Sequence, residues 1–221
     1  MFRIKICGIT SPEDAAAVAA AGADAIGLNF YAKSPRYVEP AQARTIVDAL
    51  PAGVVKVGLF VNAPAQEVCR TFDLLGLDLV QLHGDEAPEY LAALGGRSVM
   101  RAFRLGVGGL AEIGQYLRRC ETVGCPLSLV LIDAYRPGQY GGTGEVADWS
   151  ALAEYPASIT HPPLVLAGGL TPQNVAEAIR TVRPAAVDTA SGVESGPGRK
   201  DPVRVAAFVR AARDAFAEAQ S

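Results

Sequence analysis

Histidine, tryptophan and methionine are scarce in this sequence, whose 221 residues include two histidines, one tryptophan and two methionines. The four cysteines form no C-x-x-C pair, and so few histidines leave no ligand set that is typical of a zinc site. We therefore expect neither a metal nor another cofactor. The cysteines are Cys7, Cys69, Cys120 and Cys125.

An excess of positive charge and long apolar runs are also lacking. Lysine and arginine number 20 against 23 acidic residues, giving a formal net charge of −3, and the basic residues are scattered. This balance gives no support for binding nucleic acid or an anionic membrane. No apolar run approaches the length of a membrane span, and nothing resembles a secretory signal. We expect a cytoplasmic protein with free thiols, because thiols stay reduced in that compartment.

Short apolar runs, each followed by a helical pattern, recur along the whole chain. Half of the residues are hydrophobic, which is enough for a sizeable core. The runs are mostly apolar on both faces, as in parallel strands that helices cover. The predicted strands are Arg3–Cys7, Ala25–Asn29, Val54–Val61, Leu79–Leu82, Ser98–Phe103, Leu127–Ile132, Leu164–Ala167 and Ala186–Thr189. The predicted helices are Pro12–Ala21, Pro40–Leu50, Pro64–Leu74, Ala87–Leu94, Leu110–Arg119, Asp148–Glu154, Pro172–Thr181 and Pro202–Ala219.

Eight strand-helix units predict an α/β fold of the TIM-barrel type, a (β/α)₈ barrel, for which roughly 250 residues is typical. A doubly wound open sheet is the alternative, but it usually has fewer units and a topological switch point. No Pro/Ser-rich linker divides the chain. We therefore expect residues 1–221 to form one barrel domain, with its active site at the C-terminal ends of the strands.

Cys7 stands where the first strand ends, and Gly8 then turns the chain. A thiol, whose ordinary pKa is about 8.5, can be tuned to act as a base near neutral pH, although many cysteines only fill space. Lys5 lies two residues earlier and shares the face of Cys7. Its depth favours an ion pair with a carboxylate inside the barrel over Schiff-base chemistry. The sequence shows no cation beside Cys7.

Glycine turns follow the last two predicted strands. Gly168-Gly169 leads into a helix with Thr171 as the expected N-cap and Pro172 in the first helical position. Ser191-Gly192 follows the eighth strand. Such turns let a ligand approach the backbone, and their N–H groups favour an anion. The alternative is that these are only tight turns with ordinary caps. However, both glycine turns follow adjacent strands at the end of the barrel, and this position favours a phosphate site.

Four polar residues at predicted strand ends or in the loops that follow have two interpretations each. Asp133 is a candidate general acid, because a desolvated carboxyl group holds its proton more readily, or it caps a turn. Asp188 bonds a sugar hydroxyl or holds neighbouring strands together. Arg36 binds a carboxylate through paired hydrogen bonds or is solvated at the surface. His83 is a base or bonds locally within its turn.

Taken together and in this order, these motifs resemble the phosphoribosylanthranilate isomerase family over nearly the full length of the chain. No single motif is decisive, but the combination is highly specific. The motifs are Lys5-Ile6-Cys7-Gly8-Ile9-Thr10, Ser34-Pro35-Arg36, Val80-Gln81-Leu82-His83-Gly84-Asp85-Glu86, Ile132-Asp133-Ala134, Gly141-Gly142-Thr143-Gly144, Ala167-Gly168-Gly169-Leu170 with Asn174-Val175, and Val187-Asp188 through Ser191-Gly192-Val193-Glu194.

The resemblance implies a cofactor-free barrel of tryptophan biosynthesis. Such an enzyme converts N-(5-phosphoribosyl)anthranilate to 1-(2-carboxyphenylamino)-1-deoxyribulose 5-phosphate by an Amadori rearrangement. It implies a small phosphorylated substrate, and we expect a monomer or a homodimer. The resemblance implies that Cys7 is the general base and Asp133 is the general acid. It implies that Arg36 holds the anthranilate carboxylate. The expected substrate-binding residues further include His83, Asp188, Gly142, Thr143 and Gly144, with Gly168, Gly169, Ser191 and Gly192 for the phosphate.

Two other functions remain open at this point. A related isomerase of the histidine pathway also performs an Amadori rearrangement, but it has an aspartate where this chain has Cys7, and it binds two phosphates. A barrel that only binds a phosphorylated ligand would need neither Cys7 nor Asp133. The chain also departs from the family pattern at Asn29, where an apolar residue is frequent, and such a change could alter loop closure.

Overall fold

The eight predicted strands close into a parallel barrel in the order β1 to β8, and β1 pairs with both β2 and β8. The computed structural model describes residues 1–104, 109–134, 149–155, 159 and 162–219. The barrel strands are β1 (Ile4–Cys7), β2 (Ala25–Asn29), β3 (Val55–Phe60), β4 (Leu79–Leu82), β5 (Val99–Arg104), β6 (Leu129–Asp133), β7 (Leu164–Ala167) and β8 (Ala186–Thr189). The TIM-barrel prediction is confirmed, and the open sheet is excluded.

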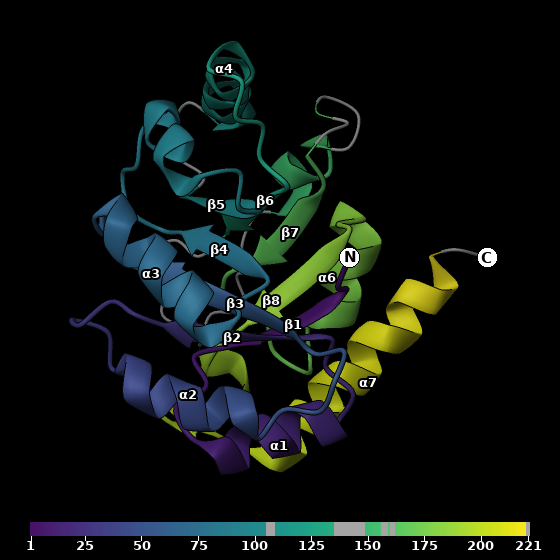
Figure 1. Cartoon of the computed structure of the whole chain (residues 1–221). Helices are drawn as coiled ribbons and strands as arrows, with labels where there is room; N and C mark the ends of the chain where they lie inside the picture. Colours follow the sequence, from purple (N-terminus) through teal and green to yellow (C-terminus); the bar gives the residue numbers. More distant parts are fainter. Residues whose placement is uncertain (105–108, 135–148, 156–158, 160–161, 220–221) are drawn as a thin grey trace.

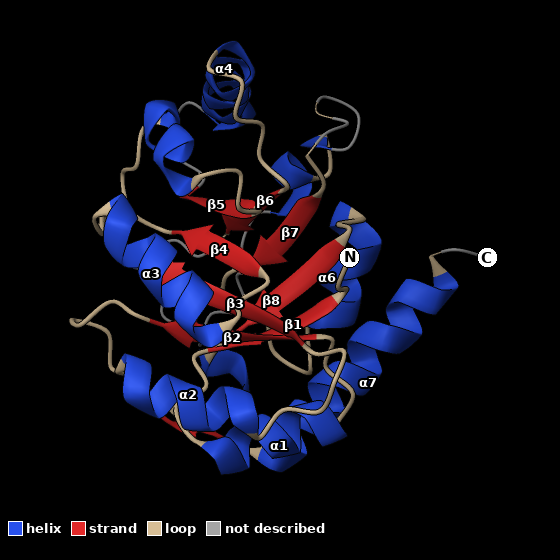
Figure 2. Cartoon of the chain, in the orientation of Figure 1, coloured by secondary structure: helices blue, strands red, loops and turns tan. Residues whose placement is uncertain are grey.

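Helices lie on the outside of the strands (Figures 1 and 2). The α-helices are α1 (Pro12–Ala20), α2 (Pro40–Asp48), α3 (Ala65–Leu75), α4 (Gly109–Thr122), α6 (Val175–Val182) and α7 (Pro202–Glu218). Short 3₁₀ helices are η1 (Pro88–Leu94), η2 (Trp149–Leu152) and η3 (Ser191–Val193). A short antiparallel hairpin of β9 (Glu194–Gly196) and β10 (Arg199–Lys200) follows β8. None of the described helices is long and apolar enough to cross a membrane.

Local sequence signals explain where the first and last helices begin. Ser11 accepts a hydrogen bond from the backbone of Asp14 at 3.1 Å, and Pro12 occupies the first turn of α1. Asp201 caps α7 in the same way, accepting from the backbone of Val203 at 2.9 Å. These caps fix the points at which the chain leaves the barrel rim.

The alternation of side chains along the strands makes two separate cores. One face packs against the helices, and the other fills the barrel. The barrel interior is apolar in its lower part and becomes polar toward the C-terminal ends of the strands, where Lys5, Gln81 and Asp188 are buried. The apolar interior consists of Phe2, Ala25, Val57, Leu79, Met100, Ala102, Leu129, Leu131, Val165, Ala167 and Ala186.

Three expectations about helices were wrong. Helix α6 begins at Val175, and Asn174 rather than Thr171 occupies the N-cap. Asn174 accepts a hydrogen bond from the backbone of Thr171 at 2.8 Å and donates to the Gly169 carbonyl at 3.0 Å, which holds the intervening residues in a turn. The segments predicted as helices at 87–94 and 148–154 form the 3₁₀ helices η1 and η2, and Asp148 lies outside the described residues.

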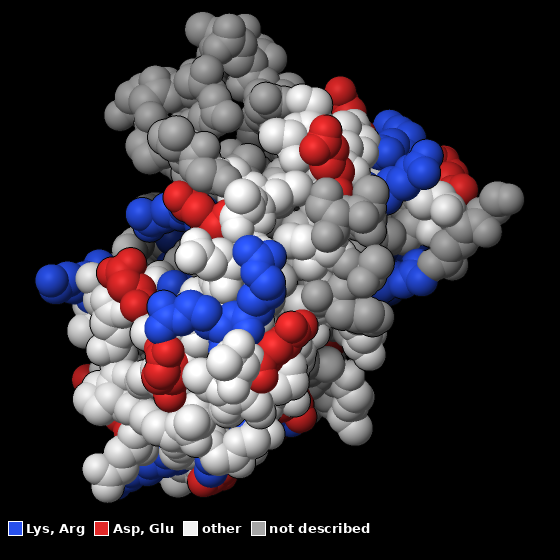
Figure 3. All heavy atoms as spheres, turned by 90° about the horizontal axis from the view of Figure 1, so that it is seen from above, with Lys and Arg blue, Asp and Glu red and all other residues white. Residues whose placement is uncertain are grey.

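Charges of both signs are interspersed on the face drawn in Figure 3, with no large area of a single sign among the residues coloured there. Several basic side chains on the protein surface pair with acidic neighbours. Arg97 contacts Asp73 at 2.6 Å, and Arg119 contacts Glu89 at 2.5 Å. This face therefore lacks the continuous basic surface that favours nucleic-acid binding.

Candidate active site

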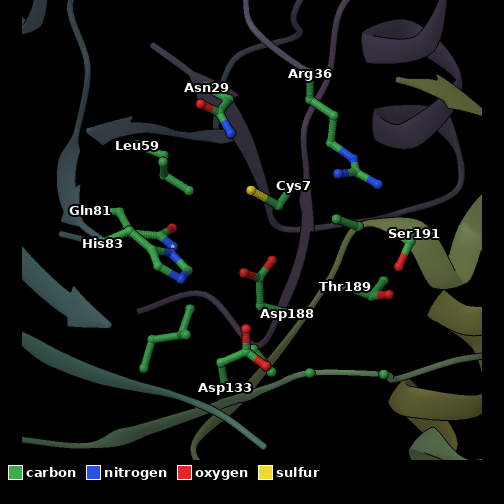
Figure 4. Close-up of a pocket in the computed structure, with 15 residues that line it drawn as sticks. Cys7, Asn29, Arg36, Leu59, Gln81, His83, Asp133, Asp188, Thr189 and Ser191 are labelled. Atoms are coloured by element: carbon green, nitrogen blue, oxygen red, sulfur yellow. Dashed lines mark hydrogen bonds between the residues drawn. The ribbon is translucent and has the colours of Figure 1, made fainter. Parts of the chain in front are cut away.

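A cavity of about 380 Å³ opens at the C-terminal ends of the barrel strands. Residues from loops or strands separated by most of the chain meet in it, as Figure 4 shows. Its lining includes these residues predicted from the sequence: Cys7, Arg36, His83, Asp133, Gly168, Gly169, Asp188 and Ser191. The structure therefore brings together the predicted site residues of β1, β6 and β8 and of four loops.

Cys7 ends β1, and Asp133 ends β6, so the two side chains enter the cavity from different parts of the barrel. Figure 4 shows them approaching from opposite sides, with Asp188 between them. Cys7 is a buried free thiol, and Asp133 is half-buried. Gly27 lies beside Cys7 in the barrel, and a Cβ there would come within 2.6 Å of the sulfur. The absence of a side chain at Gly27 therefore leaves room for the Cys7 thiol.

A buried ion pair lies directly beneath Cys7. The Lys5 ammonium is fully buried and contacts Asp188 Oδ2 at 2.9 Å. Burial opposes the charge, but attraction to Asp188 and to Cys7 outweighs it and raises the pKa of Lys5. The predicted ion pair is thus present, and it places beside Cys7 a cation that the sequence did not show there. The sequence alone did not show that Lys5 reaches both side chains.

The other oxygen of Asp188, Oδ1, is buried without a hydrogen-bond partner among the described residues. Asp188 lines the cavity, so a hydroxyl group of a ligand would satisfy this oxygen. Of the two predicted roles of Asp188, the structure shows that it ties β8 to β1 through Lys5. The hydrogen bond to a sugar hydroxyl stays a prediction, for which Oδ1 is the available acceptor.

His83 follows β4 and faces the cavity from the side opposite Arg36 in Figure 4. Its Nδ1 lies 3.2 Å from the amide nitrogen of Gln81, a buried residue of the same strand end. Burial lowers the pKa of His83 despite the opposing attraction to Asp133 and Asp188. A neutral imidazole that is held by an amide can contact a substrate through a hydrogen bond, and it does not act as a permanent cation.

Arg36 lies in the loop after β2 and packs across Gly8, where a Cβ would clash with its side chain. Gly8 also has a φ of +75°, which a residue with a side chain rarely adopts. The loop is braced by Ser34, whose hydroxyl accepts from the Arg36 backbone at 3.1 Å. Asn29 donates to the same hydroxyl at 3.1 Å, so the residue that departs from the family pattern supports the loop.

The glycine turns predicted for phosphate lie next to one another at the rim. Gly168 and Gly169 both have positive φ, at 91° and 65°, and both line the cavity together with Ser191. Gly192 is not in the lining; a Cβ there would clash with the carbonyl oxygen of Leu170. Glycine at this position lets the two turns pack in contact.

Gly142, Thr143 and Gly144 lie outside the described residues. Sequence reasoning missed Lys200 entirely and gave Glu194 no role, although both are buried beside Arg36. The signal that could have found them is the glycine- and proline-rich turn at 196–198, which joins two short strands. Within the described ranges, no group of three or more His, Cys, Asp and Glu side chains is arranged to hold a metal ion.

A family sequence model and similar proteins of known name show the family of this chain. Residues 4–211 match the sequence model of "N-(5'phosphoribosyl)anthranilate (PRA) isomerase". The N-(5'-phosphoribosyl)anthranilate isomerase of Trichlorobacter lovleyi is 50% identical over 98% of this chain and 100% of its own length. That of Geobacter sulfurreducens is 49% identical over 96% of this chain and 99% of its own.

Solved structures agree with the sequence matches. Phosphoribosyl anthranilate isomerase from Thermotoga maritima superposes with a TM-score of 0.83 at 40% identity, covering 97% of this chain and all of that one. A second structure, at 37% identity and a TM-score of 0.81, covers 97% of this chain and all of the other. That phosphoribosyl anthranilate isomerase is in complex with reduced 1-(o-carboxyphenylamino)-1-deoxyribulose 5-phosphate.

Proposed function

The chain belongs to the N-(5'-phosphoribosyl)anthranilate isomerase family, and from that premise we propose how its own residues perform the reaction. It is an isomerase of tryptophan biosynthesis that converts N-(5'-phosphoribosyl)anthranilate to 1-(2-carboxyphenylamino)-1-deoxyribulose 5-phosphate by an Amadori rearrangement. The observation that carries the mechanism is that Cys7 of β1 and Asp133 of β6 line one cavity. Simple binding of a ligand would need neither a thiol nor a carboxyl group there.

Asp133 is the general acid in this mechanism, and Cys7 is the general base. Asp133 protonates the furanose ring oxygen, and the ring opens to a protonated Schiff base. Cys7, as the thiolate, then removes the proton from C2 of the sugar, and the resulting enolamine tautomerises to the ketone. The two groups start in opposite protonation states, which different local environments allow at one pH.

Lys5 supplies the positive charge that the thiolate needs. Its ammonium is held inside the barrel by Asp188, one layer below Cys7, and it interacts with the Cys7 side chain. A charge in a water-poor interior acts more strongly than one at the surface, because the surroundings screen it less. Lys5 thus acts through Cys7 rather than on the substrate.

The remaining residues orient the substrate. Arg36 binds the anthranilate carboxylate, and His83 and Asp188 contact the sugar-bearing part of the molecule from the cavity wall. The backbone of Gly168, Gly169 and Ser191 offers N–H groups to the phosphate, with Gly192 fixing the turn. Gly142, Thr143 and Gly144 complete the phosphate end by resemblance to the family.

We further propose that one domain spanning residues 1–221 acts in the cytoplasm and binds neither nucleic acid nor membranes. The described strands of a single chain surround the cavity, so a monomer or a homodimer would carry a usable site in each barrel. We favour phosphoribosylanthranilate isomerase activity over that of the histidine-pathway isomerase, because this chain has Cys7 where the histidine-pathway enzyme has an aspartate as its base. No cofactor takes part in the proposed steps.

The activity is tested by incubating the purified protein with freshly prepared N-(5'-phosphoribosyl)anthranilate and following the loss of the substrate's fluorescence. Consumption that is proportional to protein concentration is the expected result. A parallel reaction with the histidine-pathway aminoaldose, followed by absorbance, tests the competing function. Turnover of that substrate alone would contradict the proposal.

A further inference from the structure

Arg36 does not reach the cavity as an isolated cation; it is held by a buried carboxylate. Its Nε and Nη2 donate to Oε1 and Oε2 of Glu194, each at 2.7 Å, in the paired geometry of a guanidinium and a carboxylate. Glu194 is 7% exposed and begins β9, which lies 158 residues from Arg36 in the sequence. The contact therefore joins the loop after β2 to the hairpin after β8.

Lys200 holds Glu194 from the other side. Its Nζ donates to Glu194 Oε1 at 2.8 Å and to the carbonyl of Ala190 at 3.2 Å. Lys200 is 3% exposed, and its backbone N–H donates to Asp14 at 2.9 Å. Ala190 lines the cavity immediately before Ser191, so the support of Arg36 also touches the turn proposed for phosphate.

The charges of this group do not cancel. Arg36 and Lys200 are cations, and Glu194 is the one carboxylate that both contact. Although burial opposes its charge, hydrogen bonds from Arg36 and Lys200 hold the pKa of Glu194 below its ordinary value, so it is ionised at neutral pH. These three side chains together carry one net positive charge, and a ligand carboxylate that contacts Arg36 would balance it.

The arrangement also leaves one face of Arg36 for that ligand. Two of the three guanidinium nitrogens are engaged by Glu194, and Arg36 still lines the cavity (Figure 4). A flexible arginine would lose several rotamers on binding, whereas a side chain already fixed at both Nε and Nη2 loses fewer.

We propose that Glu194 is a positioning residue for the substrate carboxylate: it orients Arg36 toward the cavity and is itself anchored by Lys200. This rests on the proposed role of Arg36. With this role for Glu194, the hairpin of β9 and β10 takes part in the recognition of a carboxylate-bearing substrate. Glu194 does not touch the reacting atoms, so it acts on substrate binding and not on the proton transfers.

The test compares Glu194→Gln with Arg36→Ala and with the double variant in steady-state kinetics. Glutamine keeps the size of the side chain but offers one acceptor oxygen and no charge. We expect Glu194→Gln to raise KM about tenfold and to change kcat less than threefold, on the scale of one charge-assisted hydrogen bond. The double variant should be no worse than Arg36→Ala, because both changes remove the same function.

Separate inhibitors distinguish positioning from a general loss of structure. Competitive inhibition by anthranilate reports the carboxylate end, and inhibition by inorganic phosphate reports the other end. Glu194→Gln should weaken the former and leave the latter within twofold of wild type. The control is Glu89→Gln, which breaks the exposed ion pair with Arg119 away from the cavity and should change neither constant.

The possible failures have different meanings. If Arg36→Ala raises KM and Glu194→Gln does not, the positioning role is refuted and the clamp stands. An unchanged KM in Arg36→Ala would refute the clamp and the positioning role together, while leaving the catalytic pair untouched. Equal weakening of both inhibitors by Glu194→Gln would also refute the inference, because it would show a structural effect on the whole site. If Glu194→Gln does not fold, Glu194→Asp, which keeps the charge but draws the carboxylate back from Arg36, takes its place with the same expected selectivity.

Discussion

At the scale of single residues, the site depends on side chains whose surroundings fix their charge. Lys5 is charged in a fully buried position because Asp188 and Cys7 attract it, and Glu194 is charged because two cations contact it. His83 shows the opposite effect, since burial favours its neutral form. His83 lines the cavity, and Lys5 and Glu194 lie behind residues that do, so the charge of three types of titratable group is set by the surroundings of one site.

The neutral state of His83 has a consequence for stability in acid. Its pKa is lowered in the folded chain, so between that value and the ordinary value of about 6.5 the unfolded chain binds a proton that the folded chain does not. Stability from this source is complete above pH 7 and falls as the pH drops. We expect His83→Asn to lose less stability than wild type between pH 7 and pH 5, as measured by the midpoint of urea unfolding. An equal loss in both proteins would show that His83 does not titrate differently on folding.

At the scale of elements, the turn after β1 and the loop after β2 are fitted to one another. Gly8 combines a positive φ with direct contact beneath Arg36, whereas Gly53, also at positive φ, has open space where a Cβ would lie, with nothing within 4 Å. A side chain at either position would strain the backbone, but only one at Gly8 would also displace Arg36.

Replacing each glycine by alanine makes that separation measurable. Gly53→Ala should lose about 1 kcal/mol of stability through strain alone and keep its KM. Gly8→Ala should lose a similar amount or more and should also raise KM, because its Cβ would push Arg36 aside. Chemical unfolding and steady-state kinetics give the two readouts. Equal KM values for the two variants would contradict the contact between Gly8 and Arg36 as a determinant of binding.

The elements also show what the sequence could and could not predict. Strands such as Ala25–Asn29 and Leu164–Ala167 were predicted to the residue, because an apolar run between turn residues is a local signal. The start of α6 was missed because the Asn174 side chain replaces the expected cap with a turn. The contact of Arg36 with Glu194 could not be predicted, since it depends on how two loops 158 residues apart meet after the barrel closes.

At the scale of the whole molecule, the seam between the first and last strands of the barrel is joined by a buried ion pair. Lys5 of β1 and Asp188 of β8 are register partners across that seam, and their side chains meet at 2.9 Å. The same pair lies beneath Cys7, so the closure of the barrel and the environment of the proposed base depend on the same two residues.

Breaking this pair should therefore affect the entire fold. Lys5→Met leaves the Asp188 charge buried without its partner and should cost about 3–5 kcal/mol of unfolding free energy in urea denaturation. The double variant Lys5→Met with Asp188→Asn should recover part of that loss, because no unpaired charge remains. Arg119→Met, which breaks a pair with both side chains more than half exposed, should cost less than about 1 kcal/mol. A Lys5→Met variant as stable as wild type would show that the pair does not support barrel closure.

The central claim, that Cys7 and Asp133 are the base and the acid, is tested most directly by the kcat of Cys7→Ser and Asp133→Asn at saturating N-(5'-phosphoribosyl)anthranilate. Cys69→Ser is the matched control, because that thiol lies on α3 and contacts the Ala93 carbonyl outside the cavity. With circular dichroism unchanged, each site variant should lose at least about a hundredfold in kcat, and the control should keep its rate. A kcat near that of wild type in either site variant would contradict the role assigned to that residue.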